Sequence, residues 1–128
     1  MRIEHVAFNV EDPVALAEWY VRHLGLTVVR KLNAAPYTHF LADTGGRTVL
    51  EIYRQTAPVP EYAKQDPMVL HVAFTTADVA AERERLLAAG ATSAGEITKT
   101  PAGDVMTFLR DPWGSVIQLV TRAVPLVP

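Results

Sequence analysis

The alternation of apolar and polar residues near the start of the chain predicts a strand followed by a helix. Residues 2–10 alternate as in a strand with one buried face. The pair Asp12 and Pro13 is a helix-start signal, because an aspartate side chain can cap free N–H groups and proline suits the first helical position. Apolar residues then recur at helical spacing until Gly25, a residue typical of a helix end.

The same arrangement occurs a second time in the chain. The tetrapeptide His5-Val6-Ala7-Phe8 recurs unchanged as His71-Val72-Ala73-Phe74, and Asp78 and Gly90 stand where the next helix would begin and end. The ends of the halves also correspond, with Glu51 opposite Gln118 when one residue is deleted. Each half is expected to continue into three short strands, near residues 26–32, 36–42 and 48–54 and near residues 92–98, 103–110 and 115–121.

These patterns predict an α+β fold made of two βαβββ modules. The modules span residues of about 1–55 and 68–122, and a linker at 56–67 with three prolines joins them into one domain of residues 1–128. In each module the helix would cover one face of a four-stranded sheet. The other face would be concave, and neither module alone could complete a cavity.

Composition narrows the classes of function. The 128 residues carry a formal net charge of −2, so the basic excess that attracts nucleic acid or anionic membranes is missing. The chain has no cysteine, which excludes disulfides, thiolate metal sites and cysteine nucleophiles. The sequence shows neither a signal peptide nor an apolar run long enough to span a bilayer. We therefore expect a cytoplasmic protein that binds neither nucleic acid nor membranes.

Four polar side chains are predicted on the concave faces, where solvation is reduced: His5, Glu51, His71 and Gln118. Taken singly, each has an ordinary interpretation, since a strand histidine is often a hydrogen-bonded core residue and a strand glutamate usually faces water. Their equivalent positions in two repeats change that interpretation, because a pseudo-twofold axis would bring them together. A buried carboxylate needs a compensating partner, and a divalent cation would supply it.

The chain resembles the vicinal oxygen chelate superfamily, which includes glyoxalase I, bleomycin resistance proteins and extradiol dioxygenases. The resemblance extends over nearly the whole chain and is carried by His5–Phe8, Leu50–Tyr53, His71–Phe74 and Arg110–Leu119. Among these families it is most similar to glyoxalase I-like members. The resemblance implies a homodimer and a divalent metal ion, zinc, nickel, manganese or iron, held from the first and fourth strands of both modules. The corresponding residues here are His5, Glu51, His71 and Gln118.

Gln118 departs from the family pattern, which usually has glutamate at this position. An amide cannot accept and return a proton. Glu51 is therefore the candidate catalytic residue, with a metal-bound hydroxide as the other possible proton carrier.

Two functions are compatible with these residues. The first is a metal-dependent glyoxalase-like lyase or isomerase, whose small substrate chelates the metal through two adjacent oxygens. The alternative is a metal-free, drug-binding protein of the bleomycin-resistance type. The sequence specifies neither the substrate nor whether the site lies within one chain or is shared across a dimer.

Other polar residues have lesser expected roles. Asn9, Tyr53 and Thr75 are expected to line the cavity, and His39, which alternates with Tyr37 on strand 36–42, is a candidate ligand contact.

Overall fold

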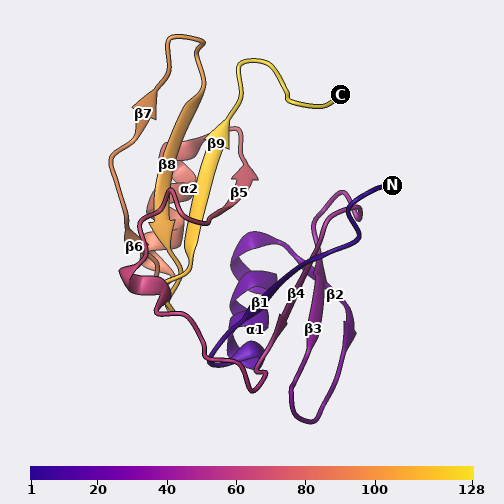
Figure 1. The fold of residues 1–128 in the computed structure, drawn as a ribbon. Helices are drawn as coiled ribbons and strands as arrows, with labels where there is room; N and C mark the ends of the chain where they lie inside the picture. Colours follow the sequence, from indigo (N-terminus) through magenta and orange to yellow (C-terminus); the bar gives the residue numbers. More distant parts are fainter. The chain divides into compact units, whose positions relative to one another are not determined.

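The computed structural model describes all 128 residues and divides them into two compact units, Met1–Pro60 and Glu61–Pro128. Each unit contains one sheet and one α-helix (Figure 1). Strand, helix and further strands follow one another in the same order in both units. This arrangement confirms the predicted α+β fold with two βαβββ modules.

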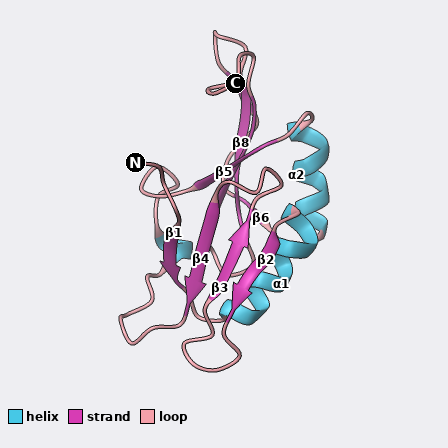
Figure 2. Ribbon diagram, turned by 90° about the vertical axis from the view of Figure 1, so that its right-hand side faces the viewer, coloured by secondary structure: helices cyan, strands magenta, loops and turns pink.

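The sheet of the first unit has the strand order β1-β4-β3-β2, which Figure 2 shows beside α1. Strands β1 and β4 are parallel and the other neighbours are antiparallel. The elements are β1 (Val6–Asn9), α1 (Pro13–Leu24), β2 (Thr27–Lys31), β3 (His39–Ala42) and β4 (Val49–Tyr53).

Helix α1 begins and ends at the residues that the sequence predicts. The Asp12 carboxylate accepts a hydrogen bond from the Ala15 N–H at 3.0 Å, and Pro13 is the first residue of the helix. Gly25 adopts a left-handed conformation with φ of 72° and donates its N–H to the Tyr20 carbonyl. The helix packs on the sheet and buries Leu16, Ala17 and Tyr20 together with Leu41, Leu50 and Ile52. We call the opposite face of this sheet, and its equivalent in the second unit, the helix-free face.

The second unit repeats this plan with the strand order β5-β9-β8-β6, and β7 also pairs with β8. Strands β5 and β9 are parallel, as β1 and β4 are. Its elements are a 3-10 helix η1 (Tyr62–Lys64), β5 (Val72–Thr75), α2 (Val79–Ala88), β6 (Thr92–Ser93), β7 (Thr98–Lys99), β8 (Val105–Arg110) and β9 (Val116–Thr121).

Helix α2 also follows the predicted signals. The Asp78 carboxylate caps it by accepting the Ala81 N–H at 2.9 Å, and Gly90, with φ of 104°, lies just beyond its end. Its apolar side is narrower than that of α1, because only Val79 and Leu86 of the helix are buried.

The prediction of a single strand at 92–98 is wrong, since the chain forms two short strands in this region, β6 and β7. Between these strands, side-chain hydroxyl groups donate hydrogen bonds to the backbone carbonyls. The Ser93 hydroxyl donates to the Gly95 carbonyl at 3.1 Å, and the Thr107 hydroxyl lies 3.3 Å and 3.4 Å from the carbonyls of Gly95 and Glu96. These carbonyls bond hydroxyl groups, so the ladder with β8 is interrupted. The first strand is also shorter than predicted, at Val6–Asn9 instead of 2–10.

Arg110 at the end of β8 binds η1 to the turn between β8 and β9. One guanidinium nitrogen donates to the Tyr62 carbonyl at 3.0 Å and to the Gly114 carbonyl at 3.2 Å. The other donates to the Gln65 carbonyl at 2.8 Å. Residues 61–67, which were predicted as part of the linker, therefore belong to the second unit.

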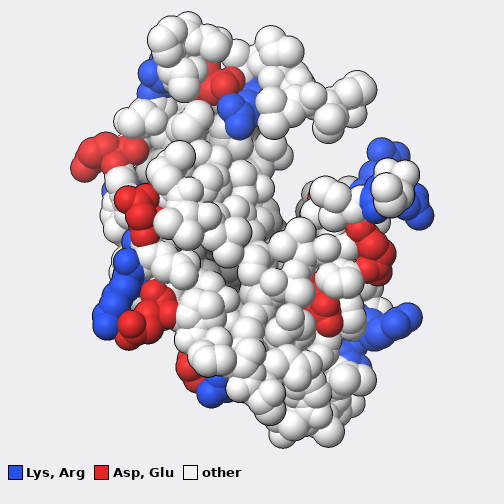
Figure 3. Space-filling model, in the orientation of Figure 1, with Lys and Arg blue, Asp and Glu red and all other residues white.

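Charged side chains on the face shown in Figure 3 lie singly or in small groups. Several are paired, as Lys64 is with Glu61 at 2.8 Å and Arg122 with Asp104 at 2.8 Å. No helix of the chain has the length and apolar character needed to cross a membrane. That the chain does not bind nucleic acid stays a prediction.

The close approach of the β8–β9 turn to η1 gives a test of the fold. Gly114 has φ of 94°, and an added Cβ would lie 2.7 Å from both the Cβ and the backbone nitrogen of Ala63. We expect Gly114→Ala to lower the free energy of unfolding by about 2 kcal/mol or more, because backbone strain and a steric clash add together. Urea denaturation would measure the loss.

Gly46 provides the matched control for this substitution. It has φ of 66°, but nothing lies within 4 Å of an added Cβ. Gly46→Ala should therefore lower the free energy of unfolding only through backbone strain, by about 1 kcal/mol. Equal losses for the two variants would contradict the close approach.

Candidate functional site

The first unit brings His5 and Glu51 together on its helix-free face. Glu51 lies in β4 opposite Ala7 of β1, and His5 stands two residues before Ala7, so the alternation of the strand places both side chains on the same face. His5 Nε2 lies 3.0 Å from a Glu51 carboxylate oxygen. An imidazole nitrogen and a carboxylate oxygen, two common metal donors, therefore converge here.

Two carboxylates surround the imidazole of His5. Its Nδ1 is hydrogen-bonded to the side chain of Glu4, while Nε2 faces Glu51. The hydrogen bond with Glu4, and the negative charges of Glu4 and Glu51, raise the pKa of His5 above its ordinary value of 6.5, against an opposing effect of desolvation. The protonated imidazolium is favoured as long as both carboxylates remain in place.

The second unit holds His71 and Gln118 at the equivalent positions. Gln118 lies opposite Ala73 across the parallel β5–β9 pair, as Glu51 lies opposite Ala7. This register confirms the correspondence between Glu51 and Gln118 that the repeat predicts. His71 Nδ1 donates to the Pro67 carbonyl at 2.8 Å, because a carbonyl can only accept. In the neutral ring, Nε2 then carries the lone pair that could bind a cation.

An aromatic ring stands beside the histidine in both units. The His5 ring meets Phe40 edge-on with 6.1 Å between centroids, and the His71 ring meets Phe108 edge-on at 5.1 Å. Phe40 is the cross-strand partner of Glu51, and Phe108 is that of Gln118. The repeat therefore extends to the apolar surroundings of the four polar side chains, a similarity that alternation within single strands did not indicate.

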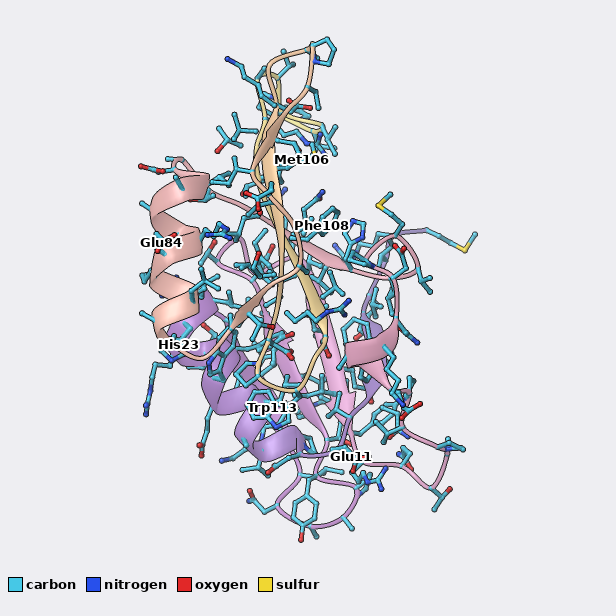
Figure 4. All side chains as sticks on the ribbon, turned by 90° about the vertical axis from the view of Figure 1, so that its left-hand side faces the viewer. Glu11, His23, Glu84, Met106, Phe108 and Trp113 are labelled. Atoms are coloured by element: carbon cyan, nitrogen blue, oxygen red, sulfur yellow. The ribbon has the colours of Figure 1, made fainter.

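Gln118 is almost fully buried, with 8% of the residue exposed. Its amide nitrogen donates to the Met106 sulfur at 3.4 Å. Met106 and Phe108, labelled in Figure 4, both lie on β8. The amide oxygen of Gln118 is the atom that could bind a cation, since an amide N–H₂ group has no lone pair to offer.

Asn9, expected to line the cavity, holds the chain that follows β4. Its amide nitrogen donates to the Ala57 carbonyl at 2.6 Å, and its amide oxygen accepts the Gln55 N–H at 2.7 Å. Both polar ends of the amide are engaged, which gives this residue a structural role.

His39 lies on the opposite face of β3 from Phe40 and Glu51, so its expected contact with a ligand at this site is wrong. It is 6% exposed and donates from Nδ1 to the Tyr37 carbonyl at 2.7 Å. With Lys31 and Val28 it lines a groove of about 190 Å³ beside α1, on the helix-covered side of the sheet.

No group of three or more His, Asp or Glu side chains in the structure is arranged to hold a metal ion. The polar residues occur as His5 with Glu51 in the first unit and as His71 and Gln118 in the second. A site made of all four therefore stays a prediction.

Comparison with known proteins identifies the family. The family model described as the Glyoxalase/Bleomycin resistance protein/Dioxygenase superfamily matches residues 2–119. The chain belongs to this superfamily. The match includes His5, Glu51, His71 and Gln118.

Several solved structures share this fold. A glyoxalase family protein from Bacillus cereus is 19% identical with a TM-score of 0.79, over 94% of this chain and 93% of the other. A glyoxalase family protein from Enterococcus faecalis is 25% identical with a TM-score of 0.72, over 94% and 97%. TnmS3, an antibiotic binding protein from Streptomyces sp. CB03234, is 22% identical with a TM-score of 0.68, over 93% of each chain. No protein with a curated description gives a significant match.

The surroundings of His5 predict a measurable titration. We expect its imidazole to titrate above pH 6.5 in NMR spectra. Glu4→Gln should lower that pKa most and Glu51→Gln less, because the hydrogen bond with Glu4 is the largest cause of the shift. Because the folded-state pKa is raised, the stability that the charged histidine contributes is fully present below the unfolded-state pKa. It is lost as the pH rises through the folded-state value.

Glu11 supplies the control carboxylate, since it pairs with Arg54 at 3.5 Å instead of with His5. Glu11→Gln should leave the His5 titration unchanged. A His5 pKa at or below 6.5 in the unmodified protein would contradict the arrangement.

Proposed function

We propose that this protein is a metal-dependent, glyoxalase-like lyase or isomerase. Its small substrate would bind a divalent cation through two adjacent oxygens. The observation that carries the proposal is the 3.0 Å approach of His5 Nε2 to the Glu51 carboxylate on the helix-free face. Two donor atoms of different chemistry can serve one cation when they lie this close together.

The residues proposed to hold the cation are His5, Glu51, His71 and Gln118. His71 fits the role because its Nδ1–H is engaged by the Pro67 carbonyl, an interaction that orients metal-binding imidazoles in many proteins. A cation bound at His5 Nε2 would replace the proton there, so two neutral imidazoles, one carboxylate and one amide would leave a formal charge of about +1 on a divalent site. When bound, the cation supplies electrostatic stabilisation to negative charge that develops on the substrate oxygens.

Glu51 is the proposed proton carrier. It is the only carboxylate among the four residues, and its side chain is 17% exposed on the helix-free face. Gln118 cannot substitute for it, since an amide does not take up and return a proton at neutral pH. His5 Nε2 lies 3.0 Å from this carboxylate, close enough for both side chains to bind one cation.

A second candidate is a metal-free protein that binds a small molecule. It is favoured by the pairing of His5, whose two ring nitrogens already face Glu4 and Glu51, so the charges of the first unit are partly balanced without a cation. The edges of Phe40 and Phe108 beside the histidines would suit a planar ligand. A protein with the same fold is described as an antibiotic binding protein. A homodimer is proposed for either function.

Metal titration tests the leading proposal. We expect the purified protein to bind Co²⁺ with a change in visible absorbance, and chelation to lower its melting temperature. His5→Gln, Glu51→Gln and His71→Gln should each weaken Co²⁺ binding by about tenfold or more, since ligand loss costs at least as much as loss of an outer partner. Turnover of glutathione hemithioacetal and a panel of 2-oxo acids should require the metal and Glu51.

His23 near the end of α1 supplies a control histidine outside the site. His23→Gln should retain metal affinity. Unchanged Co²⁺ affinity in both Glu51→Gln and His71→Gln would refute the metal site. Metal-independent, tight binding of a planar cationic ligand would then favour the second candidate.

Replacing Gln118 by glutamate tests the amide position independently. Gln118→Glu introduces a second carboxylate at the end of the ligand set, so divalent metals should bind more tightly than to the unmodified protein. Calorimetric titration with Mn²⁺ would show the difference. Unchanged or weaker binding in Gln118→Glu would mean that this position does not face the cation.

A further inference from the structure

We propose that Arg30 forms a carboxylate-binding subsite on the face that carries His5 and Glu51. This inference rests on the proposed function and extends it to the substrate class. The substrate would carry a carboxylate in addition to the two oxygens that chelate the metal.

A β-bulge places Arg30 on this face. The pairing between β2 and β3 shifts register between Val28 and Arg30, so that Val28 lies opposite Leu41 and Arg30 lies opposite Phe40. In a regular strand, residues two apart point to the same side, and Arg30 would have faced α1 with Val28. The extra residue, Val29, turns Arg30 to the helix-free face. Bulges of this kind commonly redirect one side chain near a functional site.

Arg30 stands in line with the proposed metal ligands. It pairs with Phe40, and Phe40 pairs with Glu51 on the next strand. All three side chains therefore share one row on the helix-free face. Two strand spacings separate the backbones of Arg30 and Glu51, roughly 10 Å, a distance that a small substrate and a long arginine side chain can bridge.

The guanidinium lies over the aromatic ring next to the site. Its central carbon is 6.0 Å from the centroid of Phe40, and the same ring meets His5 at 6.1 Å. This contact holds the cation near the sheet instead of extending it into solvent. None of the ion pairs in the structure includes Arg30. The donors of Arg30 are thus available to an anion, and a guanidinium group can bind a carboxylate through two parallel hydrogen bonds.

The fold does not require a cation at this position. Counting five residues from the glycine after each helix, Arg30 in the first unit corresponds to Gly95 in the second. Gly95 lies between β6 and β7, and the second unit forms its strands on both sides of this position without a cation there. Arg30 is therefore an addition to the first unit that the shared architecture does not explain.

The test compares two six-carbon acids that differ only at the far end. 2-Oxoadipate carries a distal carboxylate and 2-oxohexanoate does not, while both offer the same pair of chelating oxygens. Calorimetric titration of the Mn²⁺-loaded protein should give a Kd for 2-oxoadipate about tenfold or more below that for 2-oxohexanoate. In Arg30→Gln this difference should disappear, with the affinity for 2-oxohexanoate unchanged.

Lys31 offers a matched control on the same strand. It pairs with His39 and faces the groove beside α1, on the other side of the sheet. Lys31→Gln removes the same charge, so it should preserve the preference for 2-oxoadipate. Loss of the preference in Lys31→Gln to the same extent as in Arg30→Gln would show a general charge effect and overturn the subsite.

The outcomes separate this inference from the proposed function. If 2-oxohexanoate binds in a metal-dependent way but 2-oxoadipate binds no tighter, the subsite is wrong and the metal site stands. If 2-oxohexanoate fails to bind with Mn²⁺, while 2-oxoadipate binds the metal-free protein only when Arg30 is present, the metal site is wrong and the subsite stands. If neither acid binds with or without metal, both proposals are wrong.

Discussion

The parallel pairing of the first and last strands in each unit is the constraint on which the rest depends. It sets Glu51 opposite Ala7 and Gln118 opposite Ala73, and thereby determines which side chains accompany each histidine. A shift of one residue in either pair would turn one set of side chains to the other face of the sheet. The buried residues between sheet and helix, Leu50 and Ile52 in β4 and Ile117 and Leu119 in β9, oppose such a shift because it would expose them.

Local signals and the internal repeat made much of this structure predictable. Aspartate caps and terminal glycines define both helices without help from distant residues, and the repeated tetrapeptide leads to the equivalence of Glu51 and Gln118. The alternation of apolar and polar residues was less informative where side chains form hydrogen bonds with the backbone. The hydroxyls of Ser93 and Thr107 interrupt the expected strand at 92–98, an effect that depends on a tertiary contact.

The faces of β2 and β3 show why period-two patterns were insufficient for the site. The pattern places His39 with Tyr37 but does not specify which of the two faces meets α1, and His39 lies on the helix-covered one. The orientation of Arg30 depends on a bulge, and the sequence around Val29 carries no glycine or proline that would have indicated it. Sequence patterns therefore failed for two separate reasons: alternation does not say which face of a sheet meets the helix, and a bulge breaks the alternation itself.

The two units share a backbone plan and differ in the chemistry placed on it. His5 is flanked by two carboxylates, whereas His71 bonds to a backbone carbonyl. An acid in one unit corresponds to an amide in the other, and an arginine to a glycine. The first unit therefore carries charged side chains at Arg30 and Glu51, where the second unit carries the uncharged residues Gly95 and Gln118.

The contacts of Arg110 also bear on how the chain could be divided. The sequence repeat places the start of the second module at about residue 68, but the guanidinium of Arg110 takes two of its three carbonyl partners from Tyr62 and Gln65. A fragment that began at the repeat would leave a partly buried cation short of acceptors, which is costly. The second structural unit is therefore longer than the duplicated sequence, and a split or permuted version of this protein should be cut ahead of residue 61.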